Sequence, residues 1–174
     1  MSPPHTARLT LLPVTRDLLL AAVADPALVG KRLGLDVAAG WPNEDERGIF
    51  PGLADDLASD PALTAWIMHL IVHTADRTII GCGGPLGRPT PTGSVEVGYG
   101  IAPPYQGRGY ATEATRAMVA WSLEQASVHR VTASCLRTNT ASRRVIEKVG
   151  FRPLPPTDPY LNWEIRKGSW PPAG

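Results

Sequence analysis

Residues 102 to 114, APPYQGRGYATEA, constrain the fold more than any other stretch of the chain. Two prolines and two glycines stand directly after an apolar run and directly before an Ala-rich segment. Proline cannot donate a ladder hydrogen bond, and glycine permits tight turns and the close approach of another molecule. The stretch therefore predicts a strand that ends at Pro103, a tight corner, and a helix after the corner.

Length and charge narrow the classes of protein. At 174 residues the chain is long enough for one sizeable core, so we expect a single domain over residues 1 to 174. Seventeen basic and 16 acidic residues give no global attraction to nucleic acid or membranes. Cys82 and Cys135 lie in apolar stretches without a CxxC pair, which indicates buried thiols of a reducing compartment. With neither a leader nor a membrane-length apolar run evident, we expect a cytoplasmic protein.

The hydrophobic periodicity predicts a sheet covered by helices, of the α+β or α/β class. In the last helix Asn139 is the expected N-cap and Gly150 the C-cap. The expected strands are 7 to 14, 65 to 73, 78 to 82, 94 to 102, 130 to 136 and 161 to 167, and the expected helices are two within 17 to 35, a short one at 53 to 58, one after the corner and one from 139 to 150. Residues 83 to 93 are expected to form a loop.

A strand, a glycine-rich corner and a helix N-terminus together form an anion site, because backbone N–H groups converge there and the helix dipole adds positive charge. A Walker-type phosphate loop is excluded, because the GxxxxGK[ST] spacing and its lysine are absent. A dinucleotide fold is disfavoured, because Thr112 stands in place of the third glycine and Pro103 and Pro104 interrupt the strand exit.

The segment Gln106-Gly107-Arg108-Gly109-Tyr110-Ala111 resembles the Q/R-x-x-G-x-G/A signature of the GCN5-related N-acetyltransferases, the GNAT superfamily. The resemblance extends from about Ser94 to Phe151 and includes VEVGYGIA and NTASRRVIEKVGF. It is similar to the subgroup with ribosomal-protein N-terminal acetyltransferases of the RimJ and RimL type. It implies a mixed, mostly antiparallel sheet that splays at a central bulged strand, with helices on both faces and an acetyl-CoA-binding core over about 94 to 151.

The resemblance also implies which residues hold acetyl-CoA as the co-substrate. The pantetheine arm would insert beside the splayed strand, with backbone groups near Ile101 and the side chain of Asn139 as contacts. The pyrophosphate would lie on the N–H groups of the corner, and Arg108 would either add charge to it or stay solvated. The implied cofactor-binding residues are Ile101, Gln106, Gly107, Arg108, Gly109, Tyr110, Ala111, Thr112 and Asn139.

The chemistry implied by the family is direct attack of an amine on the thioester, assisted by a base and by a group that stabilises the departing thiolate. Glu96 resembles the strand glutamate that serves as base, and the alternative is a glutamate on the opposite face that pairs or orients a loop. Many family members carry a tyrosine on the last helix where this chain has Ile146, so the usual acid is excluded. Ser142 matches the serine of RimL-like members, and its alternative is capping of the helix start.

Other candidates come from the N-terminal part. His69 and His73 share one strand face but lack further ligands at suitable spacing, so we expect no metal site. Trp41 lies in the irregular region where the family places its acceptor loops, and it is the candidate substrate contact, although large aromatic residues more often belong to the core.

We therefore expect an acetyl-CoA-dependent N-acetyltransferase that acts on a primary amine. The RimJ and RimL resemblance favours a protein N-terminus, while small amines and antibiotics stay open as acceptors. The rival from another class is a non-catalytic module that binds acyl-CoA as a sensor. Neither nucleic acid nor a membrane is an expected partner, and a homodimer stays open.

Overall fold

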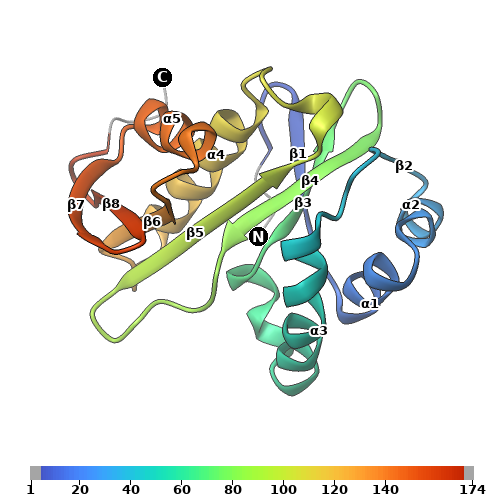
Figure 1. Ribbon diagram of the computed structural model, residues 1–174. Coiled ribbons are helices and arrows are strands. Elements are labelled where there is room, and N and C mark those ends of the chain that lie inside the picture. Colours follow the sequence, from blue (N-terminus) through green and yellow to red (C-terminus); the bar gives the residue numbers. More distant parts are fainter. Residues whose placement is uncertain (1–4, 171–174) are drawn as a thin grey trace.

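A computed structural model describes residues 5 to 170 of the chain. Its centre is a sheet in the order β1-β3-β4-β5-β6-β8-β7, with a short β2 beside β4 (Figure 1). The pairs β2 with β4 and β5 with β6 are parallel, and the others are antiparallel. The strands are β1 (Leu9–Pro13), β2 (Asp36–Val37), β3 (His69–His73), β4 (Thr78–Pro85), β5 (Ser94–Ile101), β6 (Arg130–Leu136), β7 (Arg152–Thr157) and β8 (Tyr160–Arg166).

Helices cover both faces of this sheet. One apolar core packs α1 (Arg16–Ala24), α2 (Pro26–Leu33) and α3 (Glu44–Ser59) on β3 and β4. Two other clusters pack α4 (Tyr110–Glu124) and α5 (Thr140–Val149) on the strands, α4 against β1, β3 and β4 and both helices against β5, β6 and β8. Two 3₁₀ turns, Pro61–Trp66 and Pro103–Tyr105, complete the elements. The mixed, mostly antiparallel sheet with helices on both faces confirms the expected fold class.

The splay expected at the centre of the sheet is present, but β5, the strand that splays, does not carry the expected bulge. β5 pairs with β4 in an unbroken register from Val97 to Ile101. The register shift near the centre lies between β3 and β4, where Ile71 pairs with Gly81 and the next residue, Val72, with Ile79. The extra residue, Ile80, is therefore on β4, and β5 ends where Pro103 and Pro104 stop the ladder.

The N-terminal part differs most from the expectation. The short helix expected at 53 to 58 is a 16-residue helix. Asn43 and Glu46 form a capping box that starts it at Glu44, nine residues earlier than expected, and Pro51 lies within its first half. The strand expected from residue 65 begins at His69, since Pro61 and the residues after it form a 3₁₀ turn.

In the C-terminal part, the proline-rich β7 was not expected, because Pro153, Pro155 and Pro156 are typical of a loop. As an edge strand, β7 tolerates them. The extent of the domain, 1 to 174, stays a prediction.

Candidate active site

The parallel strands β5 and β6 separate soon after they start. They pair at Ser94, Val95 and Glu96, whereas β5 stays paired with β4 as far as Ile101. Within residues 5 to 170, the edge of β5 from Val97 to Ile101 that faces β6 has no strand partner, and the two strands diverge (Figure 1). Backbone groups along a free strand edge can bind an extended ligand in the way that they bind another strand.

The corner after β5 presents backbone donors at a helix N-terminus. Gly107 and Gly109 have φ angles of +74° and +84°, in the left-handed region that favours glycine. α4 starts at Tyr110, and its first helical bond runs from the N–H of Glu113 to the carbonyl of Gly109 at 3.0 Å. The N–H groups of the first helical turn thus have no partner within the helix, and the helix dipole adds partial positive charge. This geometry suits a phosphate.

Arg8, just before β1, contacts the corner although it lies about 100 positions away in the sequence. Its Nε donates to Oε2 of Glu113 at 2.7 Å, and its Nη1 donates to the carbonyl of Arg108 at 3.2 Å. The guanidinium also lies over the ring of Tyr110, 4.5 Å from its centroid. Burial raises the pKa of Glu113, but hydrogen bonds from Thr6 and Arg8 and the Arg8 charge outweigh burial, and the pKa lies below its ordinary value. Arg8 and Glu113 are 105 positions apart, so sequence periodicity gave no signal for this contact.

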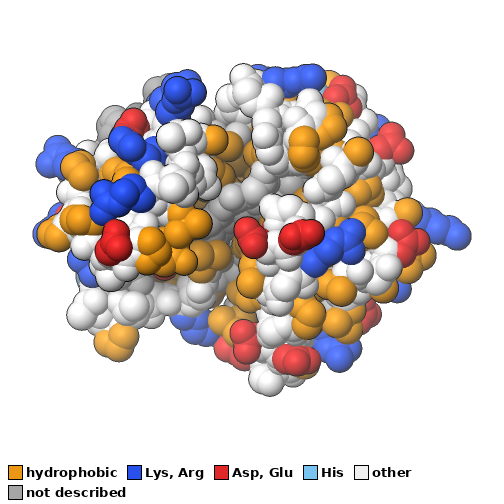
Figure 2. All heavy atoms as spheres, viewed as in Figure 1, with side chains coloured by type: hydrophobic (Ala, Val, Ile, Leu, Met, Phe, Trp, Pro, Cys, Tyr) orange, Lys and Arg blue, Asp and Glu red, His pale blue; other side chains and the backbone are white. Residues whose placement is uncertain are grey.

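A cavity of about 630 Å³ joins the free edge of β5 to the corner. Figure 2 shows the hollow that separates the α5 side of this face from the α3 side. The walls come from four elements: the start of α3, the end of β5, the corner with the first turn of α4, and α5. The lining residues are Asn43, Asp45, Tyr99, Gly100, Ile101, Tyr105, Gln106, Gly107, Gly109, Tyr110, Ala111, Thr112, Asn139, Ala141, Ser142, Arg144, Val145 and Lys148.

Most of the residues expected to bind acetyl-CoA meet in this cavity. Eight of the nine line it, the exception being Arg108, which is exposed and lies 5.5 Å from the ring centroid of Tyr105. Among them, Asn139 caps α5 by accepting from the N–H of Ser142 at 3.0 Å, and Gln106 donates to the carbonyl of Ile101 at 2.7 Å. One backbone acceptor near Ile101 is therefore already occupied by a side chain.

Tyr99 and Ser142 meet across the gap between β5 and α5. The phenol oxygen of Tyr99 lies 2.9 Å from Oγ of Ser142, and it donates to the Ser142 carbonyl at 3.1 Å. Burial raises the pKa of Tyr99 to about 12, although the hydrogen bond with Ser142 lowers it, so the phenol is protonated at neutral pH. Tyr99 was missed by the sequence analysis. Strand alternation places Tyr99 on the same face of β5 as Val95 and Val97, but it does not indicate which residue of α5 packs against that face.

The position that carries tyrosine in many family members is Ile146, which is 1% exposed and packs in the core. Its side chain therefore lies beneath α5 and not in the cavity.

Glu96 lies outside the cavity lining. Its side chain is exposed, and Oε1 accepts a hydrogen bond from Oγ of Ser134 at 2.6 Å. Glu96 pairs with Thr132 in the last pair before β5 and β6 separate. Glu96 therefore lies where β5 and β6 begin to separate, a few residues before the part of β5 that lines the cavity.

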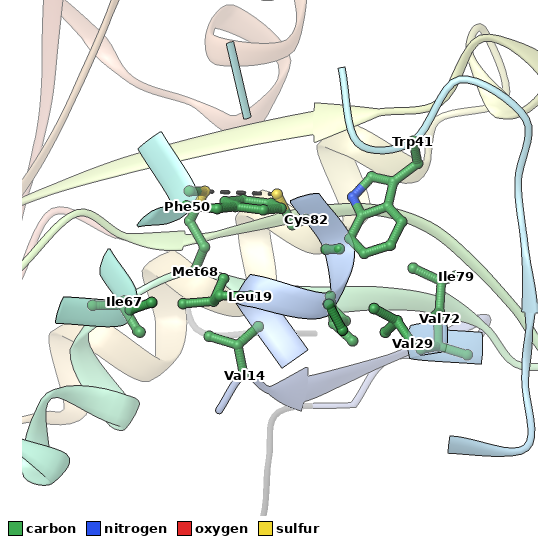
Figure 3. Packing of buried hydrophobic residues seen from close by; sticks show 14 of the residues in the cluster. Val14, Leu19, Val29, Trp41, Phe50, Ile67, Met68, Val72, Ile79 and Cys82 are labelled. Atoms are coloured by element: carbon green, nitrogen blue, oxygen red, sulfur yellow. Dashed lines mark hydrogen bonds between the residues drawn. The ribbon is translucent and has the colours of Figure 1, made fainter. Parts of the chain in front are cut away.

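Trp41 also lies outside the cavity lining. It is 3% exposed, and its ring packs 6.4 Å from that of Phe50 among the core residues (Figure 3). Its indole nitrogen has no hydrogen-bond partner within the described part of the chain. The residues that reach the cavity from this region are Asn43 and Asp45, just after Trp41. The sequence analysis missed both of them, together with Arg144 and Lys148 of α5, which are exposed cations of a kind that usually faces solvent.

The histidines of β3 have partners in the fold. A ring nitrogen of His69 lies 2.9 Å from the carbonyl of Ile67, and burial lowers its pKa. His73 contacts the phenol of Tyr110 at 3.0 Å and the carboxylate of Asp76 at 3.1 Å. From residue 5 to residue 170, no three histidine, cysteine or acidic side chains gather as metal ligands. Over the same range, no helix combines the length and the apolar character that crossing a membrane requires.

The chain is similar to proteins of one family. The profile of the acetyltransferase (GNAT) domain matches residues 8–152. An uncharacterized N-acetyltransferase of Bacillus subtilis, YjdG, is 30% identical over 91% of this chain and 95% of its own length. The FsC-acetyl coenzyme A-N(2)-transacetylase of Aspergillus fumigatus is 29% identical over 84% of this chain and 63% of its own length.

Solved structures share the fold at low sequence identity. The RimL ribosomal L7/L12 alpha-N-protein acetyltransferase in complex with coenzyme A superimposes with a TM-score of 0.68 at 15% identity, over 95% of this chain and 98% of that one. The ribosomal-protein-S5-alanine acetyltransferase of Vibrio fischeri also gives 0.68 at 15% identity, over 97% and 98%. The chain belongs to the GNAT family and is an acetyl-CoA-dependent N-acetyltransferase, as the sequence analysis expected.

Proposed function

We propose that the protein transfers the acetyl group of acetyl-CoA by direct attack to the primary amine of a second substrate, with the α-amino group of a protein N-terminus as the favoured acceptor. The observation that carries the proposal is the continuous cavity, which runs from the donor-rich corner past the free edge of β5 to the start of α3. Such a cavity accommodates both substrates in contact with one strand, which is the arrangement that direct transfer needs.

The corner and α5 provide the donors for acetyl-CoA. The pyrophosphate fits the N–H groups of Gly107 to Thr112, where the start of α4 offers them without competing side chains at the two glycines. Arg144 and Lys148 line the cavity from α5 and supply positive charge for the phosphates. The pantetheine arm then lies along β5 near Ile101, with Asn139 on the opposite wall.

Tyr99 and Ser142 are the proposed hydrogen-bond donors to the departing sulfur. Both line the cavity, and together they form a hydroxyl pair where the chain has Ile146 in place of the familiar tyrosine. A thiolate of reference pKa about 8.5 is already a tolerable leaving group, so a hydrogen bond to the sulfur suffices and full proton transfer is not needed. Positioning of the amine supplies most of the remaining acceleration.

Glu96 is the proposed base of the family pattern, acting through water. An α-amino group, with a reference pKa of about 7.7 to 8.0, is partly neutral at pH 7, whereas a lysine at about 10.4 needs more help. The exposure of Glu96 and its hydrogen bond to Ser134 argue for an indirect role. Glu96→Gln tests this role: a base acting through water predicts loss of turnover at low pH with unchanged CoA affinity, and full activity at every pH would remove Glu96 from the mechanism.

A small cationic amine is the second candidate acceptor. Asp45 and Asn43 stand at the α3 end of the cavity, where a carboxylate and an amide suit an ammonium group of any origin. The Aspergillus fumigatus relative is named as an N(2)-transacetylase, which also favours acceptors other than proteins.

Release of free thiol from acetyl-CoA distinguishes the acceptors. We expect turnover with peptides that carry a free N-terminus and none with the same peptides after N-terminal blocking. Turnover only with polyamines, amino acids or aminoglycosides would replace the first acceptor class by the second.

A further inference from the structure

A buried carboxylate lies at the acceptor end of the cavity and has no part in the mechanism above. α3 begins with three acidic residues, of which Glu44 and Asp45 are exposed and Glu46 is 6% exposed. Oε2 of Glu46 accepts from the N–H of Asn43 at 2.7 Å, and Oδ1 of Asn43 accepts from the N–H of Glu46 at 2.8 Å. This capping box fixes the position of the Glu46 side chain at the helix start.

The other oxygen of Glu46 lies against the central strands. Oε1 accepts a hydrogen bond from Sγ of Cys82 on β4 at 3.1 Å. Cys82 is paired with Gly100 on β5, and a Cβ placed on Gly100 would collide with Oε1 of Glu46. Position 100 therefore needs glycine because the carboxylate occupies the space of its side chain.

The carboxylate is thus separated from the cavity by very little protein. Gly100, Asn43 and Asp45, which contact or adjoin Glu46, all line the cavity. The hydrogen bonds from Asn43 and Cys82 use about half of the acceptor capacity of a carboxylate, so Glu46 can accept another donor. Neither Glu46 nor Glu96 belongs to the cavity lining itself. Glu46 adjoins three lining residues, whereas Glu96 is hydrogen-bonded to Ser134 where β5 and β6 begin to separate.

We propose that Glu46, in place of Glu96, receives the acceptor amine, takes its proton and holds its nitrogen for attack. This inference rests on the proposed function and names the group that prepares the acceptor. The ammonium gives one proton to the carboxylate, and the neutral nitrogen uses its lone pair to form the C–N bond as the C–S bond breaks. The thiolate and the surplus nitrogen proton together give the free thiol, and Glu46 returns its proton to solvent.

The groups around Glu46 fit this role. Burial, together with the negative charge of Glu46 beside it, raises the pKa of the Cys82 thiol well above its ordinary value, so Cys82 stays a protonated donor. Arg47 is the cation next to Glu46 in the sequence, and its guanidinium donates to the carbonyls of Pro42 and Val23. β5 presents Gly100, and the carboxylate of Asp45, which lines the cavity, favours an approaching cation.

Glu46→Gln tests the proposal without removing the helix cap, since glutamine also completes a capping box. We expect kcat at pH 7 to fall about 100-fold, and the deficit to shrink as the pH rises above the pKa of the acceptor amine, because the neutral amine needs no base. CoA affinity should stay within about twofold of the wild-type value. Glu44→Gln, an exposed residue of the same turn, is the matched control and should retain wild-type kinetics.

Gly100→Ala is a second variant that keeps Glu46 and its cap but displaces the carboxylate, so its pH profile should resemble that of Glu46→Gln. If the wild type turns over and the Glu46→Gln profile runs parallel to it, Glu46 is not the proton acceptor. If the wild type binds CoA but turns over no amine, the proposed function itself fails, and this inference fails with it.

Discussion

The phenol oxygen of Tyr99 lies 2.9 Å from the hydroxyl oxygen of Ser142, so a residue of β5 reaches α5 at the point where β5 and β6 have separated. This contact joins the two walls of the cavity. It also brings a hydroxyl pair to the cavity although Ile146 is buried in the core.

Removal of the phenol should slow the reaction. Tyr99→Phe keeps the ring but loses the hydrogen bond, and a bond to a charged sulfur is worth roughly 1.5 to 3 kcal/mol, so we expect kcat to fall about 10- to 100-fold. CoA affinity should change little. Ser142→Ala should have a similar effect, and the double variant should be little worse than either single one, because the two hydroxyls act together. Fully additive losses in steady-state kinetics would mean that they act independently.

The pKa of Tyr99, about 12, predicts the shape of the pH profile. The phenol stays protonated up to pH 10, so its ionisation should cause no loss of activity below that pH. The pH profiles of the wild type and Tyr99→Phe should therefore have the same shape below pH 10. The pKa of Tyr99 is raised above its ordinary value of 10.0, so the phenol contributes to the free energy of unfolding in full below pH 10. This contribution is lost as the pH rises through about 12. Chemical denaturation between pH 8 and 11, with wild type and Tyr99→Phe compared, measures this loss.

A side chain at Gly109 should weaken CoA binding. Gly109→Val adds strain at φ +84° at the N-cap of α4 and fills space beside the donors of the corner, so we expect the Kd for CoA to rise at least about tenfold. Gly34→Val is the control, because Gly34 also has a positive φ, +66°, but it ends α2 and does not line the cavity. Calorimetric titration that finds equal Kd values for both variants would contradict the anion site.

The positive charges of α5 should matter for CoA in a salt-dependent way. Arg144→Glu with Lys148→Glu reverses two charges at the cavity, and we expect roughly tenfold weaker CoA binding at low salt and a smaller difference at 1 M salt. Lys31→Glu with Arg32→Glu in the last turn of α2 changes the net charge equally and is the control. An equal loss in both double variants would indicate a general charge effect.

The contact of Arg8 with Glu113 should make stability sensitive to acid. The pKa of Glu113 is lowered in the folded protein, so its contribution is present above the ordinary glutamate pKa of about 4.3 and is lost as the pH falls through the folded value. Glu113→Gln should reduce the unfolding free energy by about 1 kcal/mol at pH 7, with a smaller difference at pH 3. The exposed Glu124→Gln is the control, and denaturant titrations at the two pH values measure both.

Local patterns predicted the C-terminal half of the fold well. The strand 130 to 136, the caps Asn139 and Gly150, and the corner at 102 to 109 depend on signals within a few residues, namely alternation, capping side chains and glycines. The expected cofactor residues come together because most of them belong to one continuous corner.

Contacts between distant segments could not be predicted in this way. Tyr99 meets Ser142 over 43 positions, and Glu46 meets Cys82 over 36, and neither spacing leaves a periodic signal. Trp41 was chosen for its place in an irregular segment, but the aromatic ring packs into the core while the polar residues that follow it reach the cavity. The capping box that starts α3 was also missed, so the helix was expected to be much shorter than it is.

Acetyl transfer to an amine is tested by thiol release from acetyl-CoA, measured with a panel of N-terminal peptides, polyamines, amino acids and aminoglycosides. Calorimetric titration of CoA is measured alongside. We expect CoA to bind and at least one class of amine to be acetylated, with unblocked N-terminal peptides as the best acceptors. Tight CoA binding without turnover on any amine would contradict the transfer, and absence of CoA binding would contradict the assignment of the cavity.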